Sequence, residues 1–159
     1  MASSHAPGKA TLDERSNHCF VCGPDNPKGL HLDFSIDTTD PAAPISTAHI
    51  QLDHHYQGPP GYLHGGLIAT LLDEAMSKLN RPLHALAMTR NMQIDYLRPV
   101  PLDKPIIVTG RHLRRAGRKL YNEAQITLPN GTLLAEAKGL FIVIEETLLT
   151  EPQDEVQST

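Results

Sequence analysis

A run of apolar residues at helical spacing lies near the middle of the 159-residue chain and constrains its fold most strongly. The residues recur at every third or fourth position: Leu67, Ile68, Leu71, Leu72, Ala75, Met76 and Leu79. This spacing predicts an α-helix whose apolar stripe is too broad for a surface helix. Other parts of the chain must therefore cover it. Gly65 and Gly66 stand at its start, and Pro82 is expected to close it.

Six further segments have the pattern of β-strands. They are Leu30–Ile36 and Ile45–Leu52 before the helix, then Leu86–Leu97, Lys104–Arg115, Lys119–Leu128 and Thr132–Ile144 after it. Two short strands, one buried helix and a long antiparallel meander indicate an α+β protein. A curved antiparallel sheet wrapped round one long central helix, the hot-dog fold, would cover the helix. A conventional two-layer α+β sandwich explains the same periodicities.

Composition is that of an ordinary globular protein, with a net charge of −4 and 40% apolar residues. One domain is expected over residues 18–145, between a flexible N-terminal tail (1–17) and a flexible acidic C-terminal tail (146–159). The acidic balance argues against nucleic-acid binding. No apolar run approaches the roughly 20 residues of a membrane span, and the chain start lacks a secretory signal, so a cytoplasmic location is expected.

Asp73 lies on the small and polar strip of the otherwise apolar helix, together with Gly66, Thr70 and Ser77. Its carboxylate is expected to face an enclosed polar space, either as a catalytic group or as a structural group satisfied by hydrogen bonds. The adjacent Glu74 lies about 100° round the helix and is the competing candidate.

His64, Gly65 and Gly66 stand where the helix begins and where unsatisfied backbone N–H groups collect. Glycines let a ligand approach these N–H groups closely, which suits a polarised carbonyl or a developing oxyanion. A tight turn is the alternative explanation. Neither GxGxxG nor GxxxxGKS/T occurs, so the glycines are not a phosphate loop.

These residues carry a family resemblance. The string YQGPPGYLHGGLIATLLDEAMSKL at Tyr56–Leu79 resembles the HGG-x6-D helix of hot-dog thioesterases of the PaaI-like group. Its GPPG is similar to that of the animal acyl-CoA thioesterase superfamily members 4 and 5. The resemblance continues through NHCFVCGPDNPKGLHLDF, MQIDYLRPVPLDKP, GRKLYNEAQI and AKGLFIVI, and so covers most of the chain between about Asn17 and Glu145.

The resemblance implies an acyl-CoA thioesterase that releases a carboxylic acid and free CoA without a metal or redox cofactor. It assigns the catalytic carboxylate, as general base or nucleophile, to Asp73, and the N–H that polarises the thioester carbonyl to Gly65. His64 and Thr89 hold positions that belong to the site in the branch of members 4 and 5. Some other branches carry an Asn before HGG, where Gly58 stands here.

Two other functions stay open at this point. A hot-dog acyl hydratase or dehydratase needs a His and a carboxylate poised for proton removal, and only the HGG-x6-D arrangement is found. A non-catalytic acyl-CoA or acyl-carrier binding protein would keep the fold without turnover. The sequence does not indicate which acyl group is bound.

The spacing of Gly65 and Asp73 predicts an assembly. Eight residues separate them, which corresponds to about 12 Å along one helix. One thioester carbonyl cannot reach both. If both act on it, one subunit supplies Gly65 and the other Asp73 across a two-fold axis. A homodimer is expected, and further pairing into a homotetramer is open.

The strand after the helix carries Thr89, which either bonds the Asp73 carboxylate or its water, or is a threonine selected for β propensity. Alternation puts Met88, Met92, Ile94 and Tyr96 on an apolar face, and Thr89, Asn91, Gln93 and Asp95 on a polar one. The polar face is expected to line the interface or the site.

Positive charge gathers at one expected hairpin, at Arg111, Arg114, Arg115, Arg118 and Lys119. Such a cluster suits the pyrophosphate and 3′-phosphate of CoA, although a solvated hairpin end explains it equally well. The residues predicted to bind substrate are Gly66, Asn91, Arg98, Arg118 and Lys119.

Cys19 and Cys22 form a CxxC pair with only His18 and His31 nearby, at spacings that match no standard zinc site. Prolines follow at once, which disfavours a thioredoxin-like site opening a helix. We therefore predict no metal ligands, with metal capture across subunits left open.

Overall fold

The computed structural model describes residues 17–145 of the chain. Of these, residues 17–32 belong to one compact unit and residues 33–145 to another. The tail predicted over residues 1–17 lies outside the described residues except for Asn17, and the tail over residues 146–159 lies wholly outside them. The predicted domain boundaries stay a prediction. No helix in the described part is long and apolar enough to cross a membrane.

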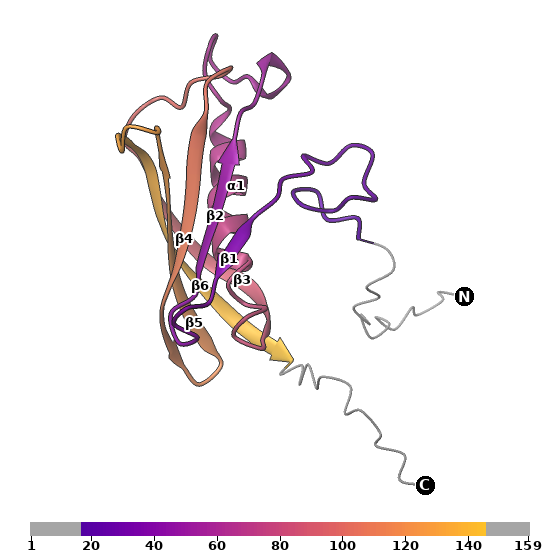
Figure 1. Cartoon of the computed structure of the whole chain (residues 1–159), viewed down its shortest axis with the longest axis vertical. Coiled ribbons are helices and arrows are strands. Elements are labelled where there is room, and N and C mark those ends of the chain that lie inside the picture. The colour runs from indigo at the N-terminus through magenta and orange to yellow at the C-terminus, as the bar shows by residue number, and fades with distance from the viewer. Residues whose placement is uncertain (1–16, 146–159) are drawn as a thin grey trace, which may run out of the picture. The chain divides into compact units, whose positions relative to one another are not determined.

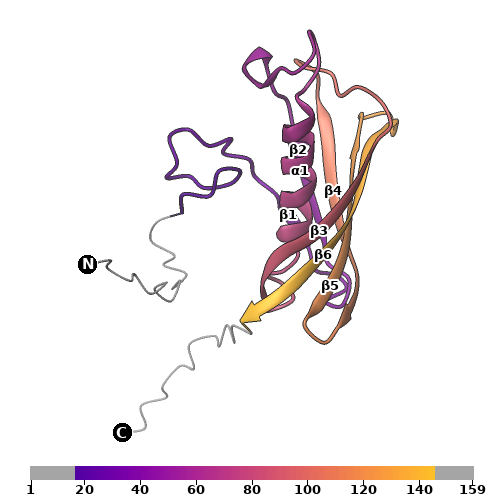
Figure 2. The ribbon, with the colours of Figure 1, turned by 180° about the vertical axis from the view of Figure 1, so that it is seen from behind.

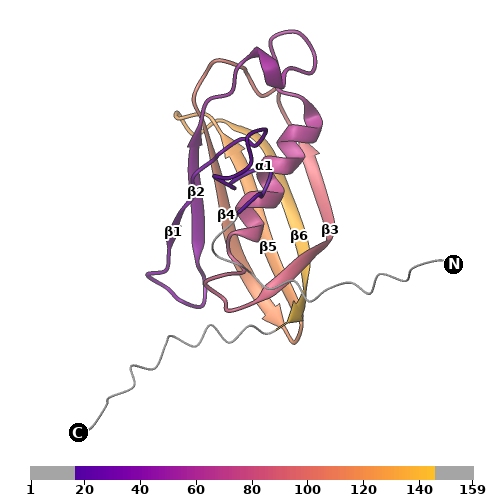
Figure 3. The ribbon, with the colours of Figure 1, turned by 90° about the vertical axis from the view of Figure 1, so that its right-hand side faces the viewer.

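The unit that starts at Asp33 is a six-stranded antiparallel sheet with one helix on one face (Figures 1 and 3). Its elements are β1 (Ser35–Asp37), β2 (Ile45–Ile50), the 3-10 turn η1 (His54–Tyr56), α1 (Gly65–Ser77), β3 (Leu86–Tyr96), β4 (Ile106–Ala116), β5 (Lys119–Thr127) and β6 (Leu133–Glu145). The strand order is β1-β2-β4-β5-β6-β3. The predicted α+β class, with one central helix against an antiparallel sheet, is confirmed.

Helix α1 turns its apolar stripe to the sheet and contacts strands β2, β3, β4, β5 and β6. Leu71, Leu72, Ala75 and Met76 have no exposed surface. The sheet approaches the helix closely at Gly139, where a Cβ would lie 2.9 Å from the Met76 sulfur. The prediction of a buried helix is confirmed.

The helix ends earlier than predicted, at Ser77 rather than just before Pro82. Side chains of the sheet donate hydrogen bonds to carbonyl groups in the last turn of the helix. Ser46 Oγ donates to the Ala75 carbonyl at 2.6 Å, and Asn122 Nδ2 donates to the Met76 carbonyl at 3.1 Å. Because these carbonyls are satisfied by the sheet, the chain can leave the helix before the proline.

Five of the six predicted strands are confirmed, with ends within two residues of those expected. The strand predicted over Leu30–Ile36 is wrong, because only Ser35–Asp37 is extended in the sheet. Leu30 and Leu32 instead donate backbone hydrogen bonds of 2.8 Å to the loop that precedes them. The predicted meander is also only partly right. β4, β5 and β6 follow one another in the sheet, whereas β3 pairs with β6 and forms the edge.

Strand β3 contains a bulge at Arg90. Thr89 pairs with Phe141 of β6, but the next paired residue is Asn91, which pairs with Leu140. Arg90 is thus an extra residue without a partner in the ladder, and every side chain beyond it is shifted by one position.

The bulge corrects the predicted division of β3 into two faces. Thr89 pairs with the buried Phe141, and Met92 pairs with Gly139, whose Cβ would meet Met76 of the helix. Thr89 and Met92 therefore share the face that carries α1, although they are three residues apart. Asn91 lies on the opposite face. The prediction that Thr89 and Asn91 share a polar face is wrong, because a strict period of two does not hold across a bulge.

Candidate active site

Two hydrogen bonds join α1 to β3, and the first is formed by Asp73 and Thr89. The Thr89 hydroxyl donates to the Asp73 Oδ1 at 2.7 Å. Asp73 is half-buried on the helix, and Thr89 is exposed just before the bulge of β3. The hydrogen bond between Thr89 and the Asp73 carboxylate, one of the two explanations offered for Thr89, is therefore present. A catalytic role for either residue stays a prediction.

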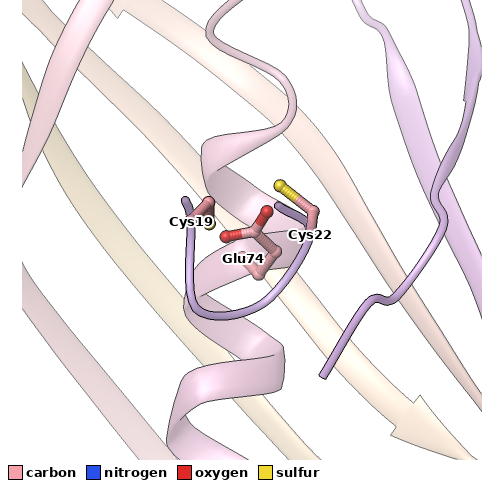
Figure 4. A group of neighbouring side chains, drawn as sticks. All are labelled: Cys19, Cys22 and Glu74. Carbon is pink, nitrogen blue, oxygen red and sulfur yellow. The ribbon is translucent and has the colours of Figure 1, made fainter. Parts of the chain in front are cut away.

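The surroundings of Asp73 change its acidity. Burial raises the pKa of its carboxyl above the ordinary 3.8, the hydrogen bond from Thr89 lowers the pKa, and the charge of Glu74 raises it. The net direction is upward, so the carboxylate accepts a proton more readily than an exposed aspartate does. Glu74 projects from α1 (Figure 4) and forms an ion pair with Lys78, with 3.4 Å between Nζ and Oε1.

The start of α1 is capped by a histidine. The Gly66 N–H donates to Nδ1 of His64 at 2.9 Å. The N–H groups of Leu67 and Ile68 donate to the His64 carbonyl at 2.9 and 3.1 Å. Among the N–H groups of this first turn, that of Gly65 has no acceptor within residues 17–145. It is therefore the donor that remains for a bound molecule.

The second hydrogen bond between α1 and β3 comes from Tyr96, whose hydroxyl donates to the Gly65 carbonyl at 3.2 Å. A Cβ on Gly65 would have only a carbon of this ring near it, at 3.8 Å. Crowding within the described chain therefore does not require glycine at position 65. Sequence reasoning missed Tyr96. No local signal marks this bond, because Tyr96 is 54% exposed and water could satisfy its hydroxyl.

The chain thus carries two separate groups of candidate residues between α1 and β3, which lie side by side (Figure 2). We call His64, Gly65 and Tyr96 the donor half-site, and Asp73 with Thr89 the acceptor half-site. Eight residues of one α-helix separate Gly65 from Asp73, or about 12 Å.

Two of the predicted substrate-binding arginines bind backbone carbonyls. Arg98 Nη1 donates to Leu133 at 2.7 Å, and Arg118 Nε donates to Val143 at 2.8 Å. Gly66 gives its N–H to His64, and Asn91 lies on the face of the sheet away from the helix. Within residues 17–145, no hydrogen bond or ion pair joins Asn91, Arg98, Arg118 or Lys119 to either half-site.

The basic hairpin between β4 and β5 lies at the end of the sheet that carries the acceptor half-site. Leu120, Phe141 and Thr89 form one row across β5, β6 and β3. Lys119 is in the next row, beyond Leu120. The guanidinium of Arg114 lies 3.6 Å above the ring of Tyr121.

Two other groups combine residue types that can bind a metal ion. Asp53, His54 and His55 have donor atoms within 4.8 Å of one another, and all three are exposed. Asp53 caps η1 by accepting from the His55 N–H at 2.9 Å and from its Nδ1 at 2.8 Å, so a turn explains this group. Cys19 and Cys22 lie on one turn of the N-terminal unit (Figure 4) and are not joined to each other by a disulfide. The prediction of no metal site stays a prediction.

The chain is similar in sequence to known thioesterases. Residues 60–135 match the family model of the Thioesterase superfamily. Acyl-coenzyme A thioesterase THEM4 of Mus musculus is 37% identical over 92 residues, which are 57% of this chain and 40% of that protein. Acyl-coenzyme A thioesterase THEM5 of Homo sapiens is 24% identical over 106 residues, 66% of this chain and 43% of that protein. The chain thus spans less than half the length of these relatives.

Solved structures share the fold. One thioesterase superfamily protein is 31% identical with a TM-score of 0.72, over 79% of this chain and 60% of that one. A thioesterase protein of Streptococcus pneumoniae, solved with coenzyme A, is 19% identical with a TM-score of 0.63, over 72% of this chain and 90% of that one. The hot-dog fold and the resemblance to thioesterases are confirmed. The helix and sheet described above are therefore similar to those of thioesterase superfamily proteins, whose family model matches residues 60–135 of this chain.

Proposed function

We propose that the chain is an enzyme that hydrolyses an acyl-CoA thioester to a carboxylic acid and free CoA. The observation that carries the proposal is the Asp73 carboxylate, half-buried, raised in pKa and held by Thr89. The same helix offers the free N–H of Gly65 at its start. Relatives named acyl-coenzyme A thioesterases, and a structural neighbour solved with coenzyme A, support the substrate class.

In the general-base route, Asp73 accepts a proton from water as the water oxygen attacks the thioester carbonyl carbon. The carbonyl electron pair moves onto oxygen, where the Gly65 N–H stabilises it. The carbon–sulfur bond then breaks, and the CoA thiolate takes the proton back from Asp73. CoA enters only as part of the substrate, and both atoms and charges balance without a further reactant.

In the nucleophilic route, an Asp73 oxygen attacks the carbonyl carbon and expels CoA, leaving a mixed anhydride that water hydrolyses. Hydroxylamine distinguishes the routes, because it converts such an anhydride into a hydroxamate on Asp73. Mass spectrometry of protein quenched during turnover should find this adduct only if the nucleophilic route operates.

The separation of the half-sites supports a shared site in a homodimer. One carbonyl cannot bridge the roughly 12 Å between Gly65 and Asp73 along a helix. Strand β3 is an edge of the sheet, and it carries the exposed Met88 and Tyr96. Thr89 and Tyr96 mark opposite parts of β3, so antiparallel pairing of two β3 edges would bring the donor half-site of one subunit to the acceptor half-site of the other. A dimer of such dimers is an open extension.

A structural neighbour supports the choice of Asp73 and Thr89. The S. pneumoniae protein has been solved with one aspartate and, separately, one threonine replaced by alanine, at positions 16 residues apart. Asp73 and Thr89 are also 16 residues apart. We propose that they act together in this chain.

We further propose that the basic hairpin, with Lys119 and Arg118, meets the phosphates of CoA. Its place at the acceptor end of the sheet supports this assignment. Arg98 and Asn91 receive less support, since neither lies in that hairpin; Arg98 and Arg118 alike hold a backbone carbonyl, and Asn91 and Lys119 alike lie on the outer face of the sheet. The cytoplasmic location expected from the sequence is part of this proposal, and imaging of a fluorescent fusion would test it.

A thiol-release assay over a panel of acyl-CoA esters tests the function. We expect turnover of at least one ester, and a fall of about 100-fold or more in Asp73→Asn, because the amide cannot accept the proton or attack. Glu74→Gln is the matched control and should change the rate far less. Loss of turnover in Glu74→Gln with a silent Asp73→Asn would move the role to Glu74. Tight binding of CoA esters without any turnover would favour a binding protein.

A further inference from the structure

One peptide group at the start of α1 is held at both of its polar ends. Its carbonyl is that of Gly65, which accepts from the Tyr96 hydroxyl at 3.2 Å. Its N–H is that of Gly66, which donates to Nδ1 of His64 at 2.9 Å. Both bonds come from side chains, one from the residue before the helix and one from β3.

The neighbouring peptide group is held as well. It joins His64 to Gly65, and its carbonyl accepts from the N–H groups of Leu67 and Ile68 at 2.9 and 3.1 Å. The N–H at its other end is that of Gly65, the one that has no acceptor in the described chain. The two peptide planes on either side of the Gly65 Cα are thus both fixed, and with them the direction of this N–H.

Such restraint matters because two successive glycines have more backbone freedom than any other pair. Without it, the Gly65 N–H would sample several directions, and part of any stabilisation of a charged carbonyl oxygen would be lost in ordering it. A Cβ at position 66 would lie 3.2 Å from Nδ1 of His64, so the capping side chain would have to shift slightly to make room for it.

We propose that Tyr96 is a positioning residue which, together with Nδ1 of His64, fixes the direction of the Gly65 N–H for the thioester carbonyl. The proposal rests on the proposed function. It also defines the state of His64. Because Nδ1 accepts a hydrogen bond, the ring carries its proton on Nε2. The imidazole therefore acts on the backbone through one nitrogen and leaves the other for the substrate side.

Tyr96→Phe is the first test, because it removes only the hydroxyl. We expect kcat to fall roughly three- to tenfold, as for the loss of one hydrogen bond, with KM and the melting temperature nearly unchanged. Tyr62→Phe is the matched control, an exposed tyrosine of the preceding loop that is outside both half-sites, and it should leave kcat unchanged. An unchanged kcat in Tyr96→Phe, in an enzyme that turns over substrate, overturns the proposal.

Histidine variants separate capping from direct chemistry. His64→Ala removes the acceptor for the Gly66 N–H, whereas His64→Asn supplies another side-chain oxygen that favours this position at a helix start. We expect His64→Asn to recover much of the kcat that His64→Ala loses. Failure of asparagine to recover any activity, with the Gly66 amide still protected, would show that His64 acts by another route and overturns its part in the proposal.

The backbone itself gives a readout that does not depend on turnover. In protein labelled with 15N-glycine, the Gly66 amide should exchange with solvent slowly in the wild type and faster in both Tyr96→Phe and His64→Ala. If the wild type hydrolyses no ester but this pattern is found, the proposed function fails while the restraint on the diglycine stands. If Tyr96→Phe changes neither the Gly65 nor the Gly66 amide, the restraint by Tyr96 is wrong whatever the activity.

Discussion

At the scale of single residues, the acidity of Asp73 is set by three neighbours that act in different directions. Burial raises its pKa, the hydroxyl of Thr89 lowers it, and the charge of Glu74 raises it. Hydrolysis by either route needs the ionised carboxylate, so the rate should fall on the acid side as Asp73 takes up a proton. The midpoint of that fall in kcat/KM follows the pKa of Asp73 in the free enzyme.

Thr89→Val and Glu74→Gln should therefore shift this midpoint in opposite directions. Loss of the Thr89 hydroxyl removes an influence that lowers the pKa, so the midpoint moves to higher pH. Loss of the Glu74 charge removes an influence that raises it, so the midpoint moves to lower pH. Profiles of kcat/KM between about pH 4 and pH 8 measure both shifts. Thr89→Ser keeps the hydroxyl and serves as the control, and shifts of the same sign in Thr89→Val and Glu74→Gln would contradict this account.

The sequence singles out Asp73 and Gly65 as candidates but leaves Tyr96 out, and the reason lies in the range of the interactions. The polar strip of the helix and the HGG-x6-D string are local patterns within a few turns. The bond from Tyr96 to Gly65 joins residues 31 positions apart. It also depends on a bulge that no periodic pattern marks.

At the scale of elements, strand β3 works because of the extra residue at Arg90. The bulge lies between Thr89 and Asn91, and it is what makes a strict period of two misplace Thr89. If Arg90 is taken out of the count, Thr89, Met92 and Ile94 fall on the helix side by simple alternation. The side of the sheet on which each residue lies is therefore set by pairing with β6, not by position in the sequence.

Deletion of Arg90 should accordingly be tolerated. It turns the bulge into regular pairing while Thr89 and Met92 keep their faces, so we expect a folded protein that retains activity within about tenfold. Deletion of Gln93 is the matched control. It would force Ile94 and the residues beyond it to the wrong face, and we expect it to unfold the protein. Circular dichroism and thermal melts of both variants test this, and an unfolded Arg90 deletion would refute it.

The end of α1 depends on buried polar groups of the sheet that the sequence did not reveal. Asn122 donates to the Met76 carbonyl at 3.1 Å, and its Oδ1 accepts from Nδ1 of His112 at 2.7 Å. Asn122 is 46 positions from Met76. In the sequence it is one polar residue at the inward positions of an alternating strand, and no local pattern shows that it reaches Met76.

Asn122→Ala should lower the free energy of unfolding by about 2–3 kcal/mol, because it leaves the Nδ1–H of His112 buried without a partner and removes one of the bonds to the Met76 carbonyl, which keeps the N–H of Leu79. Asn91→Ala, on the exposed outer face of β3, should change it by less than about 0.5 kcal/mol. Denaturant unfolding of both variants gives the comparison. Equal effects would mean that the Asn122 bonds contribute nothing beyond an exposed asparagine.

At the scale of the whole molecule, the proposed dimer makes each site a composite of two chains. The donor half-site of one chain would serve the acceptor half-site of the other. Sequence spacing alone leads to this expectation, since helix geometry sets the distance between Gly65 and Asp73. The order of the strands could not be read in the same way, because pairing β3 with β6 is a long-range choice that leaves no local signal.

Mixing two variants with damaged sites tests the composite site, once the residual activity of each has been measured alone. Asp73→Asn damages only the acceptor half-site, and His64→Ala damages only the donor half-site. In a mixed dimer one of the two sites is then built from intact halves, while the other carries both defects. Subunits exchanged at equal amounts should recover about a quarter of wild-type activity, since half of the dimers are mixed and each has one intact site. No recovery, with exchange verified by mass, would place each site within a single chain.

The two hydrogen bonds between α1 and β3 have a consequence for how a pair of sites would communicate. Each bond ties the helix to the strand at one place, the first between Gly65 and Tyr96 and the second between Asp73 and Thr89. In the composite dimer, the two hydrogen bonds of one chain belong to different sites. A ligand that displaces the residues of one hydrogen bond therefore also strains the helix and strand that support the other site.

Because the two sites share these helix–strand pairs, we expect unequal occupancy of the two sites. A non-hydrolysable acyl-CoA analogue titrated calorimetrically should bind the second site more weakly than the first. Tyr96→Phe should reduce the difference in affinity, because it removes one of the two hydrogen bonds between helix and strand. Two identical and independent sites in the wild type would show that the helix and strand adjust locally and transmit no strain from one catalytic centre to the next.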